Sequence, residues 1–474
     1  MTTGLLRGNC LEQLLLIPDE SVDSIVTDPP YELGFMNKGW DSSGIAYNTE
    51  LWAQCLRVLK PGGHLLAFGG SRTYHRIAVA IEDAGFEVRD SIHWTYGSGF
   101  PKSMNVGKSI EGYLTTGSSN KNNFKNLNGE RLERGDWGLS KAQQAHGVRD
   151  TNYDETAGET RLGKLEATTT EAQNWEGWGT ALKPSHEPIV VARKPLVGTV
   201  ANNILTYGTG GINIDGTRVG GEERTYDPTM TSGNFETTGG GKNEKSGTAT
   251  VEGRWPANTI LTHSPDCASV NDEWQCAEGC PVPVLDEQSG IRPGGVFPAV
   301  RGKSEIGAFG AGGTHKDKPN QARNMGDSGG ASRYFTQTAY EEADFPPFIY
   351  QAKASTKERN AGLGDLETKQ TVGGGGLTEA GDKYGSIKAP GKNFHPTVKP
   401  ISLMRHLIRL VTPPNGLVLD PFLGSGTTAV AAVLENCRWV GCELTEEYWP
   451  IIEGRINWAQ SEVLNQTPTQ ESLF

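Results

Sequence analysis

The segment Ser24-Ile25-Val26-Thr27-Asp28-Pro29-Pro30-Tyr31 runs from an apolar stretch into a double-proline turn. The apolar stretch predicts the end of a buried strand. Prolines have no N–H group and a fixed φ, so the strand ends at Asp28. Open α/β sheets bind ligands at the carboxyl ends of their strands, where this turn would lie. A carboxylate, proline carbonyls and a tyrosine ring at that place suit a planar substrate with an NH2 group, although a plain proline turn is the simpler alternative.

The rest of the chain up to residue 96 alternates between predicted helices and strands. The same alternation returns after residue 393, which together predicts an α/β fold of the doubly wound type. The predicted helices cover residues 11–15, 51–59 (stopped by Lys60-Pro61-Gly62-Gly63), 71–84, 401–411 and 428–435, and the predicted strands cover 24–28, 64–68, 86–96, 417–420 and 439–443.

A glycine-rich turn, Pro421-Phe422-Leu423-Gly424-Ser425-Gly426-Thr427-Thr428, follows the predicted strand that ends at Asp420. Strand, glycine turn and helix together let a ligand approach backbone N–H groups at the helix N-terminus. Glu443 ends the next predicted strand, where dinucleotide-binding folds place the acid that holds ribose hydroxyls. The turn lacks both the G-x-G-x-x-G pattern and a P-loop lysine. A nucleoside cofactor without a triphosphate therefore fits better than NAD or ATP, and a helix-opening turn with no ligand stays open.

Three segments together resemble the amino-group DNA methyltransferases, which act on N6 of adenine or N4 of cytosine. Residues 28–31 resemble their catalytic tetrapeptide, 420–428 their S-adenosylmethionine loop, and 395–400 (His-Pro-Thr-Val-Lys-Pro) the segment flanking the cofactor. The order is that of the beta group, with the tetrapeptide first. The resemblance covers about residues 5–96 and 393–456. It implies a Rossmann-like methyltransferase sheet in circularly permuted order, with a large irregular insert.

The resemblance also implies roles. Asp28 and the Pro29 carbonyl would accept hydrogen bonds from the target amine, with Pro30 completing the rigid turn and Tyr31 stacking on a base flipped out of the duplex. Glu443 would hold the ribose and Lys399 the methionine carboxylate. The residues expected to bind the cofactor are Asn9 (where family members often have Asp against the adenine), Lys399, Asp420, Phe422, Gly424, Ser425, Gly426, Thr427 and Glu443. Asp before Pro-Pro favours adenine N6, and cytosine N4 stays open.

Four parts are expected: residues 1–96 (catalytic part), 97–392 (loop-rich DNA-binding and target-recognition insert), 393–460 (cofactor-binding part) and 461–474 (polar tail). Within the insert, residues 185–193, 258–261 and 348–354 are predicted islands of structure, and the first and third would complete the sheet. Candidate DNA contacts are Trp94, Thr95, Tyr96, Lys102, Lys108, Arg301, Lys303, Lys316, Lys318 and Arg323.

His263-x3-Cys267 and Cys276-x3-Cys280 place four metal-ligand side chains at short spacings within the insert. Such a set could bind a structural zinc ion that orders a loop with little core of its own. The spacing is not that of a standard finger, and apolar packing of each cysteine is the alternative.

Composition and charge limit which binding partners the chain can have. A formal net charge of -12 over 474 residues argues against a non-specific nucleic-acid coat but leaves room for a local basic groove that holds double-stranded DNA. Seven scattered cysteines fit reduced thiols, and neither a membrane span nor a signal peptide is evident, so a cytoplasmic location is expected. The family resemblance implies that the cell is bacterial or phage-infected. A methyltransferase for RNA or protein amines and a catalytically silent DNA-binding regulatory module remain as alternatives. A restriction endonuclease partner, the recognition sequence and the oligomeric state are left open.

Overall fold

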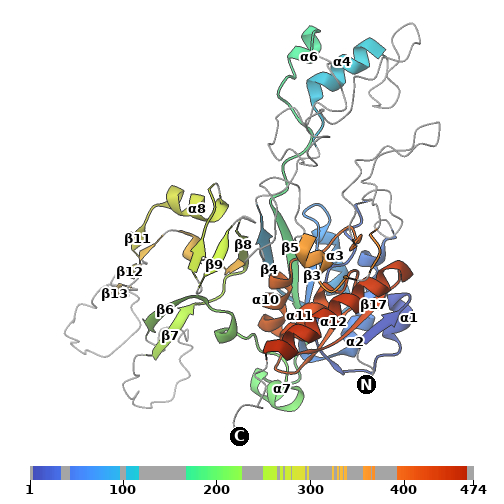
Figure 1. The fold of residues 1–474 in the computed structure, drawn as a ribbon, viewed down its shortest axis with the longest axis vertical. Coiled ribbons are helices and arrows are strands. Elements are labelled where there is room, and N and C mark those ends of the chain that lie inside the picture. Colours follow the sequence, from blue (N-terminus) through green and yellow to red (C-terminus); the bar gives the residue numbers. More distant parts are fainter. Residues whose placement is uncertain are drawn as a thin grey trace, which may run out of the picture.

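A computed structural model describes residues 4–33, 43–96, 103–116, 167–226, 249–263, 267–270, 273–278, 280–293, 296–297, 323–324, 328–329, 331–334, 336–338, 356–364, 366–368 and 392–466. Its main feature is a nine-stranded sheet in the order β1-β17-β16-β2-β3-β5-β4-β8-β15 (Figure 1). The strands are β1 (Gly4–Arg7), β17 (Arg438–Glu443), β16 (Leu417–Asp420), β2 (Val22–Thr27), β3 (Leu59–Phe68), β5 (His186–Arg193), β4 (Glu87–Thr95), β8 (Thr259–Thr262) and β15 (Thr336–Thr338).

All neighbouring strands pair in parallel except β5, which is antiparallel to β3 and β4. The carboxyl ends of β2, β16 and β8 therefore lie at one edge of the sheet. The strand before the glycine turn, β16, pairs directly with β2, although it comes almost four hundred positions later. This adjacency confirms the permuted α/β fold that the sequence predicts.

Both faces of the sheet are buried, because successive strand residues point to opposite sides. Ile25 and Leu65 pack with Trp52 in one apolar cluster, and Val26 and Leu66 belong to another. The first face is covered by α1 (Cys10–Leu14), α2 (Thr49–Val58) and α3 (Tyr74–Asp83), and the second by α10 (Ile401–Val411), α11 (Thr427–Leu434) and α12 (Trp449–Gln466).

Polar contacts at the amino end of β2 fasten the two separated parts of the chain. The buried Asp23 carboxylate accepts from Leu417 N at 2.7 Å and pairs with Lys60 Nζ at 2.6 Å. Ser24 Oγ lies 2.7 Å from Thr412 Oγ1. Hydrogen bonds to a charged group are the stronger ones, so Asp23 fixes the register of β16 against β2.

Three elements outside the insert differ from expectation. β3 begins at Leu59, not at His64. The residues predicted to stop the preceding helix belong to this strand, because Gly62 N donates to Lys194 O and Lys194 N donates to Gly63 O. The short edge strand β1 was not predicted. Nor was α12, which continues to Gln466 and so passes the expected start of the tail at residue 461; residues 467–474 lie outside the described part.

The insert supplies β5, β8 and β15 to the sheet. Strand β5 joins it as predicted for residues 185–193, whereas residues 258–261 were predicted as an island of structure but not as part of the sheet, and β15 was not predicted. The third island, 348–354, lies outside the described residues. The other elements of the insert are α4 (Val106–Thr116), α6 (Thr170–Gln173), α7 (Val200–Tyr207), β6 (Val219–Tyr226), β7 (Ala249–Arg254), β9 (Ala268–Val270), β10 (Glu273–Gln275), α8 (Pro281–Ser289), β11 (Arg292–Pro293), β12 (Val296–Phe297), β13 (Arg323–Asn324), β14 (Ser328–Gly329) and α9 (Thr356–Asn360). Short 3-10 turns cover Ile45–Tyr47, Asp215–Thr217, Ala331–Tyr334 and Glu446–Tyr448.

In Figure 1, α4 and α6 lie away from the sheet at the top of the view, and α8 with β9 lies beside β8. Among the described residues, no helix is both long and apolar enough to cross a membrane.

Candidate active site

One cavity of about 1000 Å³ lies at the carboxyl edge of the sheet, where β2 and β16 end. Pockets that bury small molecules reach this size. The predicted site residues that line it are Asn9, Asp28, Pro29, Pro30, Tyr31, Lys399, Asp420, Phe422, Gly424, Ser425, Thr427 and Glu443, whereas Gly426 is not part of the lining. The two distant motifs thus form one site.

Four charged or polar side chains from three segments meet at the tetrapeptide. Lys399 Nζ lies 2.6 Å from Asp28 Oδ2, 3.1 Å from the Tyr31 hydroxyl and 3.4 Å from Glu187 Oε2. The Tyr31 hydroxyl donates to Glu187 Oε2 at 2.7 Å. These bonds fix the Tyr31 ring and surround Lys399 with acceptors of the protein itself, whereas the sequence analysis expected this lysine to hold the methionine carboxylate.

One buried cation lies between two carboxylates in this group. Burial by itself would lower the pKa of Lys399, but the carboxylates of Asp28 and Glu187 outweigh it and raise that pKa, so the lysine stays a cation. Burial, together with the same two carboxylates, raises the pKa of Tyr31 well above its ordinary value. The tyrosine therefore stays a neutral hydrogen-bond donor.

The two oxygens of Asp28 differ. Oδ2 is held by Lys399, whereas Oδ1 is buried and has no hydrogen-bond partner within the part of the chain that the structure describes. A buried carboxylate oxygen without a partner is costly, and such atoms call for an explanation. Because Asp28 lines the cavity, a donor on a bound ligand can supply the missing bond.

Glu187 was missed by the sequence analysis, although its strand was predicted. It lies near the start of β5, which the insert contributes. The available signal was an acidic residue directly before Pro188 at the head of an apolar run, in a strand predicted to join the sheet.

At the other end of the cavity, the Glu443 carboxylate is bound by the backbone of two loops. Oε2 accepts from Gly424 N at 2.8 Å and Oε1 from Thr445 N at 2.7 Å. Burial raises the pKa of Glu443 despite these bonds. Gly424 has φ +56°, and a Cβ there would lie 2.9 Å from His395 Nε2. The glycine turn is thus tightly placed against His395, a residue of the flanking segment.

Both carboxylate oxygens of Asp420 form hydrogen bonds within the protein and support the glycine turn. Asp420 accepts from Thr27 Oγ1 and Thr428 Oγ1, both at 2.6 Å, and from Phe422 N at 2.9 Å. Burial raises its pKa to about 6. Asn9 likewise has a local role, because its side chain caps α1 by accepting from Leu11 N.

A buried arginine of α12, also missed by the sequence analysis, donates hydrogen bonds to the glycine turn. Arg455 on α12 is fully buried, and its Nη1 donates to Ser425 O and to the hydroxyls of Ser425 and Thr427 at 2.9 to 3.0 Å. Gly426, with φ +82°, packs against Ile452 of the same helix.

The remaining predicted residues have mixed outcomes. His263, Cys267, Cys276 and Cys280 come together in one cluster. Trp94 is wrong as a DNA contact, because its ring is buried in the core beside Phe68. Tyr96 lines the cavity. The side chains of Lys102, Arg301, Lys303, Lys316, Lys318 and Arg323 lie outside the described part.

Comparison with known proteins agrees with this geometry. The sequence model of a family described as DNA methylase matches residues 22–454, which include both motifs and the insert between them. The chain belongs to the N6/N4 DNA methylase family. Membership of this methylase family explains why the tetrapeptide and the glycine turn, so far apart in the chain, line one cavity.

Individual relatives of the methylase match shorter stretches. The Type II methyltransferase M.HinfI of Haemophilus influenzae is 28% identical over 174 residues, covering 31% of this chain and 48% of the relative. M.XycI of Xanthomonas campestris pv. cyanopsidis is 34% identical over 96 residues, covering 20% of this chain and 32% of the relative. The chain thus spans less than half the length of these curated relatives. Among solved structures, the cytosine-N4-specific PvuII DNA methyltransferase has 12% identity and a TM-score of 0.37, with 98% of this chain and 94% of that chain covered.

Proposed function

We propose that this methylase moves a methyl group from S-adenosylmethionine to the exocyclic amine of a base flipped out of double-stranded DNA, with adenine N6 as the target. The observation that carries the proposal is the Asp28 carboxylate, which is held at Oδ2 and unpartnered at the buried Oδ1. An amine N–H donor placed in the cavity satisfies that oxygen.

The reacting amine would be held by two acceptors of the tetrapeptide. One N–H would donate to Asp28 Oδ1 and the other to the Pro29 carbonyl, which turns the nitrogen lone pair away from both. S-adenosylmethionine supplies an activated methyl group on sulfur. The nitrogen lone pair would form the new N–C bond as the S–C bond breaks, the electron pair of that bond would stay on the sulfur of S-adenosylhomocysteine, and the amine proton would pass to solvent. Placement and electrostatics therefore carry the catalysis, without a covalent intermediate.

Lys399 would keep Asp28 an acceptor in this scheme. Its cation lies in direct contact with the Asp28 carboxylate and also with Glu187, so we assign it to the catalytic group and not to the methionine end of the cofactor. Tyr31, held by Glu187, would present a fixed ring on which the extruded base stacks.

The cofactor would occupy the half of the cavity lined by the glycine turn and Glu443. Both oxygens of Glu443 already accept one backbone N–H bond, and each carboxylate oxygen has a further lone pair that can accept from a ribose hydroxyl. Phe422, Gly424, Ser425 and Thr427 line the same half, with Asn9 at its edge. The donor set and the cavity volume fit a nucleoside cofactor.

Labelled methyl transfer to duplex DNA of mixed sequence, followed by nucleoside analysis, tests the proposal. We expect N6-methyladenine with the native protein and no transfer with Asp28→Asn, while that variant still binds S-adenosylmethionine. Asp19→Asn, an exposed acid paired with Arg57, is the matched control and should transfer normally. N4-methylcytosine would change the target base but keep the mechanism. An active Asp28→Asn variant, or label only in RNA, would overturn the proposal.

The similarity to Type II methyltransferases extends the proposal to a protein partner and to a cellular location. A restriction endonuclease that cuts the same site would accompany the methylase, and the reaction would take place in the bacterial cytoplasm. Residues 97–392, which the sequence analysis interprets as a target-recognition insert, would read the target site.

A further inference from the structure

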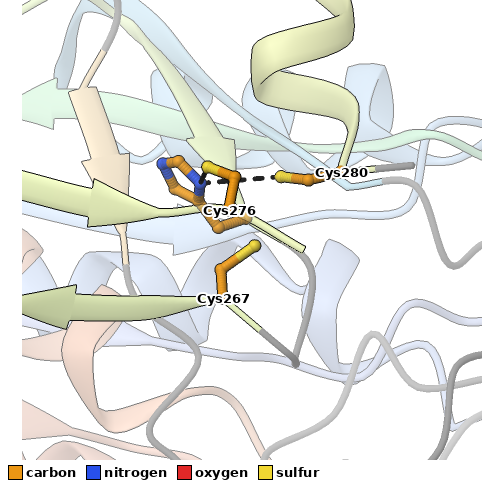
Figure 2. Close-up of side chains that lie close together, drawn as sticks. Cys267, Cys276 and Cys280 are labelled. Carbon is orange, nitrogen blue, oxygen red and sulfur yellow. Dashed lines mark hydrogen bonds between the residues drawn. The ribbon is translucent and has the colours of Figure 1, made fainter. Parts of the chain in front are cut away.

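The cluster of His263, Cys267, Cys276 and Cys280 lies outside the active-site cavity. Each residue stands at the end of a different element: His263 follows β8, Cys267 precedes β9, Cys276 follows β10 and Cys280 precedes α8. Figure 2 shows the three cysteines converging from different elements on one small space. We propose that these four side chains bind one structural zinc ion, which ties the β9–β10 hairpin and α8 to the end of β8.

The spacing of the ligand atoms fits a tetrahedral metal site. One imidazole nitrogen and three sulfurs lie within 4.8 Å of one another. His263 Nδ1 lies 3.2 Å from Cys276 Sγ and 3.6 Å from Cys280 Sγ (Figure 2). A tetrahedron with Zn–S of about 2.3 Å and Zn–N of about 2.0 Å has ligand separations of roughly 3.5 to 3.8 Å. Small movements of side chains therefore suffice to place all four ligands around one ion.

The ligand types favour zinc over the other common metals. Three thiolates and one imidazole form the Cys3His set of structural zinc sites, whereas magnesium and calcium prefer oxygen ligands. All four positions of the tetrahedron are taken by protein atoms, which is typical of a structural site rather than a catalytic one. None of the three cysteines forms a disulfide bond.

Two local features place the sulfur ligands. Ala277 N donates to Cys267 Sγ at 3.3 Å, a bond that orients the sulfur. Cys280 immediately precedes α8, a helix of nine residues with Pro281 at its first position. The start of α8 therefore fixes the backbone position from which Cys280 faces the cluster.

Among the described residues, few apolar side chains are buried around these elements. The buried apolar residues here are Cys267, Cys280 and Val282, with Leu261 and Ala277 partly buried against them. Burial of so few side chains contributes only a few kcal/mol, at about 1.5–3 kcal/mol for each large one. A structural metal is a common substitute for a missing core.

The position of the cluster links it to the proposed function. His263 comes directly after β8, at the same edge of the sheet as Asp28 after β2, because β2, β3, β4 and β8 run in parallel. The metal would therefore fix a part of the insert on the side of the molecule where DNA must approach. This last step rests on the proposed function, whereas the metal site itself does not.

Metal analysis of the full chain, purified without chelator, tests the site. We expect about one zinc ion per chain, and near zero in Cys276→Ser and Cys280→Ser. Cys437→Ser, a change to a partly buried cysteine outside the cluster, should keep its zinc. If a variant fails to fold, the native chain is loaded with cobalt instead. The visible absorption spectrum of the cobalt protein should then show a tetrahedral thiolate site.

Several outcomes would overturn the site: native protein without metal, a disulfide among the three cysteines, iron in place of zinc, or full zinc content in Cys280→Ser. Each is measured without any methylation assay, so failure of the metal site and failure of the proposed function can be told apart. With the site established, zinc removal should weaken DNA binding at least about tenfold while S-adenosylmethionine binding stays unchanged.

Discussion

Lys399 Nζ lies 2.6 Å from Asp28 Oδ2, although 371 positions separate the two residues in the chain. Asp28 follows β2, and Lys399 stands just before α10, the helix that packs across that part of the sheet. Both side chains are largely buried, at 7% and 19% exposed. The pair therefore joins residues 1–96 to residues 393–460 at the point where the proposed reaction would occur.

Replacing Lys399 with methionine separates two possible roles of the lysine. If it holds Asp28, Lys399→Met should lower kcat about a hundredfold or more, because Asp28 and Glu187 lose their shared cation, and the Kd for S-adenosylmethionine should change little. If it binds the methionine carboxylate, that Kd should rise instead. Single-turnover methyl transfer and calorimetric cofactor binding measure the two quantities.

A matched control is available at the opposite end of β2. Lys60 Nζ and Asp23 Oδ1 form another ion pair of 2.6 Å. Lys60→Met should lower the melting temperature without selectively lowering kcat. A similar loss of kcat in both variants would assign the effect to general destabilisation.

Glu187 tests whether the insert takes part in the active site. Glu187→Gln keeps an acceptor for the Tyr31 hydroxyl, so we expect only a several-fold loss of kcat. Glu187→Ala leaves that hydroxyl without its acceptor, which costs about 1–3 kcal/mol and should lower kcat about 10- to 100-fold. Glu87→Gln, which alters a partly buried pair with Arg193 outside the cavity lining, is the control. Equal activity of Glu187→Ala and the native protein would exclude Glu187 from the site.

The two motifs were predictable because each is local. The tetrapeptide and the glycine turn each follow a strand whose apolar run is continuous in sequence, and parallel strands bring their carboxyl ends to one edge. The contacts of Lys399 with Asp28 and Glu187 were not predictable in this way. They depend on β5 entering the sheet beside β3, which no local pattern specifies.

Arg455 shows a second limit of prediction from the sequence. In the sequence it is one charged residue among Glu, Asn and Gln on a C-terminal stretch, which resembles a solvated helix face. In the fold it is fully buried, because α12 packs on α11 and the glycine turn provides three acceptors for it. Burial of a charge is decided by tertiary packing, which short-range sequence patterns do not encode.

The two glycines of the turn should respond differently to substitution. Both have positive φ, so Gly424→Ala and Gly426→Ala should each cost about 1–2 kcal/mol of stability. Only Gly424 lines the cavity, and its new Cβ would press on His395. We therefore expect Gly424→Ala to raise the Kd for S-adenosylmethionine at least about tenfold more than Gly426→Ala does. Chemical denaturation and calorimetric binding give both numbers, and equal Kd values would contradict the cavity assignment.

His64 gives the fold a dependence on pH. It is a buried residue of β3, and burial, with smaller contributions from the charges of Arg193 and Arg89, lowers its pKa to about 4. In the unfolded chain a histidine titrates near 6.5. Between these values the unfolded chain binds a proton that the folded chain does not, so His64 destabilises the fold as pH falls from about 6.5 to about 4. The full effect is on the order of 3 kcal/mol at pH 4.

The effect of His64 is isolated by comparing the native protein with His64→Leu, because other titrating groups, such as Asp420, are common to both. The free energy of unfolding of the native protein, relative to that of the variant, should decrease as pH is lowered from about 7 to about 4. His75→Leu, the same change on the exposed face of α3, is the control variant. A free-energy difference between native and His64→Leu protein that stays constant over this range would show that His64 takes up its proton as readily in the folded chain as in the unfolded one.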